Sequence, residues 1–120
     1  MRTLTIRIEP DTMNALEKAG KQFTEAWQLD NYVGETMSFE SPTALFRFLT
    51  PARWGVLAAL QKSGHCGLRE LARRIERDAS AVLLDIVALS ARGLVEKDEA
   101  GQLYVPFSRI HAEFNLAQAA

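Results

Sequence analysis

The sequence has little that could be cross-linked, bound to a metal or inserted into a membrane. Its single cysteine, Cys66, cannot form a disulfide within the chain, and the lone His65-Cys66 pair falls short of the ligands that a structural zinc site needs. No apolar run approaches the roughly 18 residues of a membrane span. The N-terminus MRTLTIRIEP alternates polar residues where a secretory signal has an apolar stretch. We therefore predict a cytoplasmic protein that holds no metal and crosses no membrane.

Catalytic signatures are absent as well. The sequence contains no glycine-rich phosphate loop, no HExxH motif and no separated carboxylate pair with an identifiable general acid. His65-Cys66 is predicted in a turn, and His111 with Glu113 on the outer face of a terminal helix. Both pairs lack the companions of a nucleophile and base arrangement. We therefore predict a binding protein without a cofactor, not an enzyme.

The chain also lacks an excess of charge of one sign, since its formal net charge is −1, but its charges are unevenly distributed. Residues 51–95 contain seven basic and four acidic side chains. Residues 1–50 contain five basic and seven acidic ones, and residues 96–120 two basic and four acidic ones. Local basic patches attract phosphate groups, so we expect any contact with nucleic acid to come from the central block.

The first forty residues predict an arm made of a strand and a helix. Thr3–Glu9 alternates apolar and polar side chains, as a half-buried strand does. Asp11 can cap a helix with apolar positions at three- and four-residue steps, and ETMSFE, residues 35–40, is predicted as a second strand paired with the first. With 120 residues and 48% hydrophobic content, the chain is long enough for one domain, residues 41–120, with residues 1–40 as its arm.

Two helix-start signals follow the arm. Ser41-Pro42 and Thr50-Pro51 each offer a hydroxyl cap followed by proline at the first helical position, where its missing N–H costs nothing. Both pairs therefore predict helices, and Gly64 can end the second one.

Two further helices are predicted before residue 94. LRELARRI, residues 68–75, is a short amphipathic helix with its arginines outward. Asp78 can cap the next helix, and Gly93 can end it. The inward side chains of this helix are predicted to be Val82, Ile86 and Leu89.

The last third of the sequence predicts a β-hairpin and a final helix. LVEKDEAGQLYVPF, residues 94–107, is typical of two strands joined by a turn at residues 99–101. Ser108 can cap a last amphipathic helix. The apolar positions of that helix are Ile110, Phe114 and Leu116.

Helix, short helix, tight turn, helix and hairpin is the element order of a winged helix-turn-helix. The predicted fold class is thus α+β, mainly α, with this core, an N-terminal strand and helix arm, and a C-terminal helix. Through LTPxR, LRELAR, RDxxxVxxDxxALxxxGLVE and a wing that ends in VPF, the chain resembles the MarR-like family of small prokaryotic transcriptional regulators. The similarity covers residues 36–114, and the arm TLTIRI matches more loosely.

The resemblance implies sequence-specific binding of double-stranded DNA by a homodimer. The Asp78–Arg92 helix would enter the major groove, and the Glu96–Leu103 turn would lie along the DNA backbone. We predict a repressor that covers a promoter. The predicted DNA-binding residues are Arg69, Arg73, Arg74, Arg77, Ser80, Ala81, Leu84 and Lys97.

The predicted major-groove helix lacks the side chains that usually read bases. Between Asp78 and Arg92 there is no Lys, Arg, Asn, Gln or His, although base edges are read by hydrogen-bonding side chains of these types. On the outward face only Ser80 has a hydrogen-bonding group, while Ala81 could contact a thymine methyl. We therefore expect affinity from phosphate contacts and a modest specificity, partly read from DNA shape.

The same residues also suit roles that involve no DNA. Arginines on an amphipathic helix also form plain solvated faces, and the acidic tip KDEAG also suits an ordinary hairpin turn. Leu83, Leu84 and Val87 can pack against the arm or a second protomer, or can bind another protein. The alternative hypothesis is a winged-helix interaction protein, such as an antitoxin or an adaptor, that holds a protein partner through this apolar face.

Overall fold

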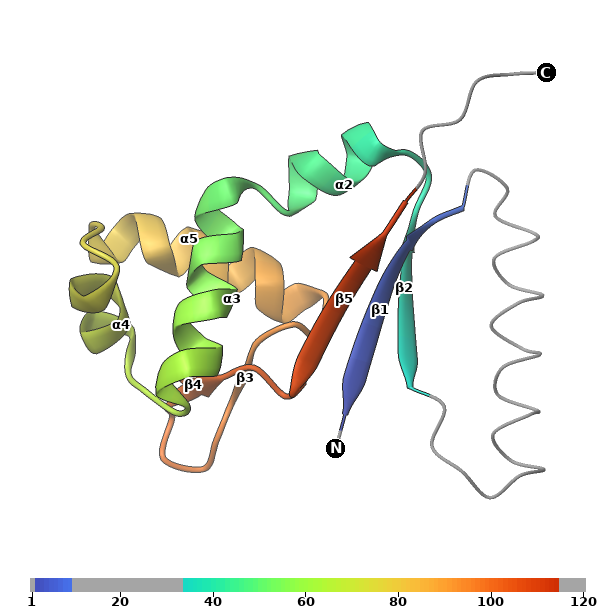
Figure 1. Cartoon of the computed structure of the whole chain (residues 1–120). Coiled ribbons are helices and arrows are strands. Elements are labelled where there is room, and N and C mark those ends of the chain that lie inside the picture. Colours follow the sequence, from blue (N-terminus) through green and yellow to red (C-terminus); the bar gives the residue numbers. More distant parts are fainter. Residues whose placement is uncertain (1, 10–33, 115–120) are drawn as a thin grey trace, which may run out of the picture. The chain divides into compact units, whose positions relative to one another are not determined.

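The computed structural model describes residues 2–9 and 34–114, which fall into two compact units (Figure 1). The first unit consists of the described residues of Met1–Phe48 and Arg109–Ala120, and the second is Leu49–Ser108. The described residues form four helices and two small sheets. The predicted α+β class is confirmed, whereas the helix predicted from Asp11 lies outside the described residues.

The first unit is built on a parallel sheet of three strands in the order β2-β1-β5. The strands are β1 (Thr3–Ile8), β2 (Glu35–Phe39) and β5 (Arg109–Glu113). In the register of the sheet, Thr5 lies opposite Thr36 on one side and His111 on the other. The two predicted N-terminal strands and their pairing are therefore confirmed, and the pairing is parallel.

Helix α2 (Pro42–Phe48) follows β2 and begins where the sequence predicts. The hydroxyl of Ser41 accepts a hydrogen bond of 3.1 Å from the backbone N–H of Ala44, which satisfies one of the free donors at the helix start. The Phe48 ring packs against Phe39 of β2 at a centroid distance of 5.9 Å. This contact fixes α2 on the strand that leads into it.

Helix α3 (Pro51–Ser63) opens the second unit. The Thr50 hydroxyl accepts a hydrogen bond of 3.3 Å from the N–H of Arg53. Gly64 ends the helix with a φ of 75°, and its N–H donates to the carbonyl of Leu60. Both predicted boundaries are confirmed.

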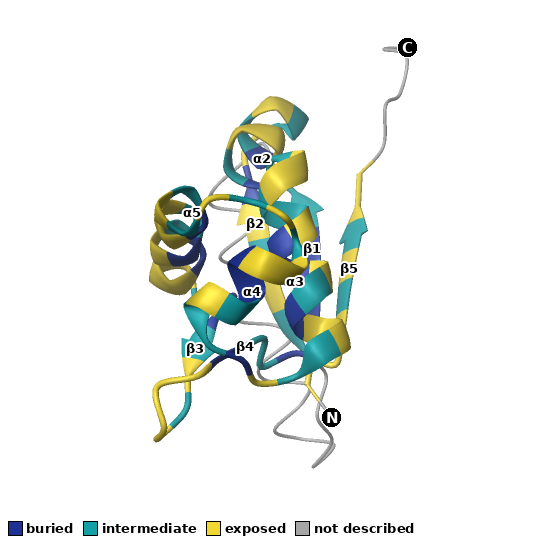
Figure 2. Ribbon diagram, turned by 90° about the vertical axis from the view of Figure 1, so that its left-hand side faces the viewer, coloured by how far each residue is buried: buried dark blue, intermediate teal, exposed yellow. Residues whose placement is uncertain are grey.

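Helices α4 (Leu68–Arg74) and α5 (Ala79–Ala91) follow and pack against α3. The Asp78 side chain caps α5 by accepting from the N–H of Ser80, and Gly93, with a φ of 77°, lies just beyond its end. Buried residues lie along one side of the α5 ribbon and exposed residues along the other (Figure 2). The buried ones are Val82, Ile86 and Leu89, as predicted.

The predicted hairpin is present as strands β3 (Glu96–Lys97) and β4 (Leu103–Tyr104), which pair antiparallel. A backbone bridge joins β4 to the segment between α3 and α4. The N–H of Cys66 donates to the carbonyl of Leu103 at 3.0 Å, and the N–H of Leu103 donates back at 2.8 Å. Two backbone hydrogen bonds therefore hold the hairpin to the segment that joins α3 and α4.

The predicted C-terminal helix is wrong, because residues 109–113 form β5. Ile110 is less exposed than its neighbours Arg109 and His111, and the same alternation continues to Glu113. This period of two belongs to a strand. Since β1 offers backbone partners along that side, pairing with a distant segment decides the conformation. His111 and Glu113 thus lie on a strand and not on a helix.

The compact units also divide the chain differently from the predicted segments 1–40 and 41–120. Helix α2 and strand β5 belong to the unit that contains β1 and β2, because β1 pairs with both of its neighbouring strands.

Within the described part of the chain, no helix has the length and apolarity needed to cross a bilayer.

Candidate nucleic-acid interface

The outward face of α5 is apolar and exposed. Leu83, Leu84 and Val87 have exposed fractions of 46%, 71% and 60%. They lie between the buried positions of the helix at offsets that turn them away from the core. Large apolar side chains gathered on one exposed face usually mark a surface that contacts another molecule.

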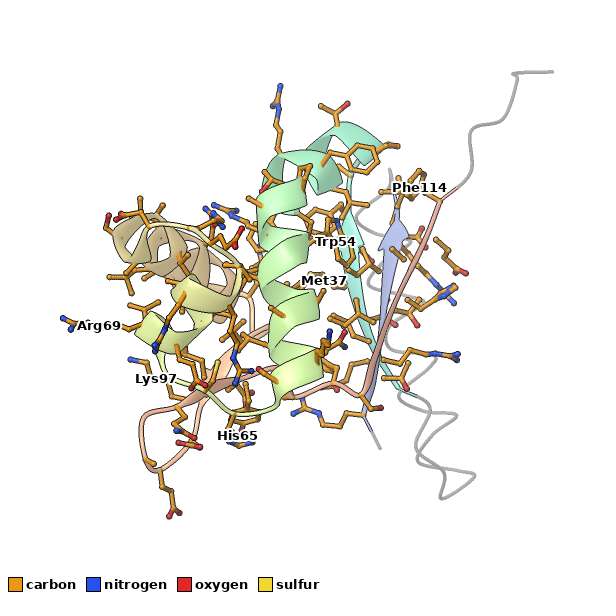
Figure 3. The ribbon with its side chains drawn as sticks, turned by 60° about the vertical axis from the view of Figure 1, so that its left-hand side comes forward. Met37, Trp54, His65, Arg69, Lys97 and Phe114 are labelled. Atoms are coloured by element: carbon orange, nitrogen blue, oxygen red, sulfur yellow. The ribbon has the colours of Figure 1, made fainter. Side chains whose placement is uncertain are left out.

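Three exposed cations lie on α4 and β3, two elements that line a groove together with α5. Arg69 projects from α4 and Lys97 from β3 (Figure 3). Arg73 is also exposed and lies in the last turn of α4. Leu68, which precedes Arg69, lines the same groove as Lys97. None of the three cations makes a hydrogen bond or ion pair with another residue in the described ranges. Their charges therefore remain available to an anionic ligand.

Arg74 is partly occupied on the surface of α4. Its Nη2 lies 2.7 Å from a carboxylate oxygen of Glu70, one helical turn earlier, and both side chains are about half exposed at 49% and 45%. A pair of this kind contributes little to stability, so a phosphate can replace Glu70 at small cost. Arg74 is the fourth predicted cation that the structure leaves accessible.

Arg77, in contrast, forms an ion pair within its own unit. Its Nη1 lies 2.9 Å from Oδ2 of Asp85, an ion pair without hydrogen-bond geometry. Arg53 donates a hydrogen bond of 3.1 Å from Nε to the other oxygen of the same carboxylate. The three side chains are mostly shielded from solvent, with exposed fractions of 13–30%. This cluster ties α3, the α4–α5 turn and α5 together.

The start of α5 offers few free groups for reading bases. The hydroxyl of Ser80 donates to the Asp78 carboxylate, which also accepts from the Ser80 N–H at 3.1 Å. The hydrogen bond from the Ser80 hydroxyl is the main reason why the pKa of Asp78 lies below its ordinary value, and hydrogen bonds from backbone N–H groups act in the same direction. Ala81 is half-buried. The only hydrogen-bonding side chain predicted to contact bases is thus already paired within the cap.

A groove of about 420 Å³ adjoins the apolar face of α5. It lies between the start of α4, the second half of α5 and the hairpin. Its walls also carry Glu96 and Lys97, whose charges are opposite. Its apolar lining comes from Leu68, Leu83, Ile86, Val87, Val95 and Leu103.

The hairpin beside this groove is anchored by a histidine. Nδ1 of His65 lies 2.6 Å from an oxygen of Asp98, and its ring stacks on Tyr104 at 4.4 Å with an angle of 2° between the planes. The other Asp98 oxygen accepts from the Gln102 N–H at 2.9 Å. The pKa of Asp98 is lowered, mainly by the hydrogen bond with His65 and to a smaller extent by the hydrogen bond from the Gln102 N–H. Asp98 is therefore a structural carboxylate of the turn.

Sequence reasoning missed both Asp85 and the His65–Asp98 pair. A signal existed for Asp85, because it is the only charged residue of α5 and directly precedes the inward position Ile86. A charge at the border of a buried stripe needs a partner. For His65 there was no local signal, because Asp98 lies 33 residues away.

No cluster of three metal-ligating side chains occurs in residues 2–9 and 34–114. In comparisons with known proteins, residues 48–112 match the family HVO_A0114, so that the match covers more than half of the chain. None of the curated proteins matches the sequence.

Proposed function

We propose that this chain, which belongs to the HVO_A0114 family, is a winged-helix regulator that binds double-stranded DNA in the cytoplasm and has no catalytic activity. The observation that carries the proposal is the set of unpaired cations Arg69, Arg73 and Lys97 on the two elements beside α5. The order of α3, α4, α5 and the β3–β4 hairpin supports it, because this is the order of a winged helix.

Phosphate contacts would provide most of the affinity in this proposal. Arg69 and Arg73 lie four residues apart on α4, so both project from one side of the helix. Arg74 can join them by leaving Glu70. Each phosphate neutralised by such a side chain releases counterions, which makes the binding strongly dependent on salt. Arg77 is left out of the interface because it holds Asp85.

The specificity would be modest, because α5 presents methyl groups where bases are usually read by hydrogen bonds. Leu84 and Ala81 can contact thymine methyls, whereas Ser80 would first have to leave Asp78. We propose that the shape and deformability of the duplex supply the remaining preference. Bound in this way to a promoter, the protein would act as a repressor by excluding other proteins from the same DNA.

A double variant tests the phosphate contacts. Arg69→Ala with Arg73→Ala should weaken binding to any duplex and lower the slope of log K against log salt by about 2, since each contact contributes about 0.9. Fluorescence anisotropy with a labelled duplex at several salt concentrations measures this. The matched control, Arg47→Ala with Lys62→Ala, removes two exposed cations from elsewhere. Equal slopes for the two double variants would contradict the proposal.

A second candidate function is favoured by the apolar face of α5. Leu83, Leu84 and Val87 adjoin a groove lined with further apolar side chains, which suits a protein partner, as in an antitoxin or an adaptor. Leu84→Glu distinguishes the candidates when compared with Ala58→Glu, which adds the same charge to an exposed position of α3. If Leu84→Glu abolishes capture of a partner while the arginine variant leaves it intact, the second function is correct.

A further inference from the structure

The outer edge of β5 is open among the described residues. β5 is the last strand in the order β2-β1-β5 and pairs with β1 alone (Figure 2). Its other side therefore presents backbone N–H and C=O groups that no described strand uses. Such an edge is a template for pairing with a strand of another chain.

The charges of β5 are placed symmetrically about its central residue. The strand reads RIHAE, with Arg109 two residues before His111 and Glu113 two residues after it. If a second copy of β5 pairs antiparallel with its centre at His111, each Arg109 lies opposite the Glu113 of the partner chain. Ile110 then lies opposite Ala112, on the other face of the sheet. Opposite charges in directly facing positions stabilise an antiparallel pair.

We propose that two copies of this chain associate through β5 in this register, around a two-fold axis at His111. The two sheets would join into one continuous sheet. A two-fold interface is self-complementary, so each residue must fit the position that its own partner occupies. β5 meets this condition with one cation and one anion at equal distances from the axis. Only the register centred on His111 pairs all five residues of the strand.

The side chains at this edge are accessible. The side chain of Arg109 is exposed and makes no hydrogen bond or ion pair within the part of the chain that the structure describes. Glu113 is half exposed, and its two carboxylate oxygens lie 2.8 Å from Nε of Arg7 on β1 and 3.3 Å from Nε2 of His111 on its own strand. The side chain of Arg7 is itself 36% exposed, so Glu113 can face a second arginine without being withdrawn from a buried site.

The opposite edge of the sheet does not fit a second copy. β2 reads ETMSF, and self-pairing centred at Met37 would place Glu35 opposite Phe39. Glu35 is also held by Arg2 through two hydrogen bonds of 2.8 and 3.0 Å. The charge pattern that fixes a register is therefore present on β5 and absent from β2.

Charge reversal on the full-length chain tests the interface. In a dimer of the Arg109→Glu variant, the new glutamate of each protomer faces Glu113 of the other protomer. In a dimer of the Glu113→Arg variant, the new arginine of each protomer faces Arg109 of the other. Each variant alone should weaken the dimer about tenfold or more. An equimolar mixture should dimerise again, because a heterodimer of the two variants has opposite charges in both facing positions. Sedimentation velocity without DNA measures all of these states.

The outcomes separate this interface from others. Lys62→Glu, a charge reversal on the exposed side of α3, should dimerise like the wild type. The proposal is overturned if the wild type stays monomeric up to about 1 mM, if Arg109→Glu dimerises normally, or if the mixture stays monomeric. Recovery in the mixture also shows that both variants are folded. Because no DNA is present, these results do not depend on the anisotropy titration that tests the proposed function.

Discussion

At the scale of single residues, Asp85 illustrates how one charge can organise a small unit. It is the only charged side chain of α5, and its two oxygens contact Arg53 of α3 and Arg77 of the α4–α5 turn. The carboxylate therefore joins α5 to α3 and to the turn that precedes α5. It also explains why an arginine predicted to bind phosphate is unavailable.

Asp85→Asn should lower the free energy of unfolding by about 1–3 kcal/mol, since it leaves two shielded arginines close together without their anion. Urea unfolding followed by circular dichroism measures the change. Glu99→Gln, at the exposed tip of the hairpin, removes the same charge and should have almost no effect. A cost for Asp85→Asn no larger than that of Glu99→Gln would show that the cluster contributes nothing.

The hairpin anchor predicts a dependence on pH. Because the folded pKa of Asp98 is lowered by His65 and Gln102, its contribution is present above the ordinary carboxyl pKa of 3.8. The contribution is lost as the pH falls through the lowered value. The melting temperatures of the wild type and Asp98→Asn should therefore differ at pH 5 and converge toward pH 3. A gap that widens on acidification would mean that the carboxylate is not stabilised by these bonds.

At the scale of elements, helices with local boundary signals could be predicted from the sequence. Thr50 and Gly64 mark the ends of α3, and Asp78 marks the start of α5, because a cap acts within one turn of the chain. Strand β5 could not be predicted in this way. Its conformation depends on pairing with β1, which is more than 100 residues away, and five residues are too few to distinguish the two periods.

Gly64→Ala tests the end of α3. The φ of 75° and ψ of −139° at Gly64 form a backbone conformation that residues other than glycine rarely adopt. Forcing another residue into it costs about 1–3 kcal/mol. Gly67→Ala is the control, because Gly67 has an ordinary φ of −77° and open space around it. Thermal unfolding should show a loss for Gly64→Ala only. Equal effects of both substitutions would indicate that backbone strain is not the cause.

At the scale of the whole molecule, the sequence predicted where charge and apolar surface gather but not how side chains pair. The exposed Leu83, Leu84 and Val87 follow from helical periodicity alone. The occupation of Arg77 by Asp85 and of Ser80 by Asp78 depends on the folded arrangement. The first contact limits the proposed phosphate contacts to α4 and the hairpin, and the second accounts for the modest specificity that we propose.

The central claim, that this protein binds the DNA of a promoter with a modest preference over other DNA, is tested by one titration. The purified chain is added to a labelled fragment of the DNA upstream of its own gene, and to a scrambled duplex of equal length, at several salt concentrations. We predict tighter binding to the upstream fragment that persists near about 0.15 M salt. Equal and weak binding that disappears with salt, or no binding, would contradict the claim and favour the protein-partner function of α5.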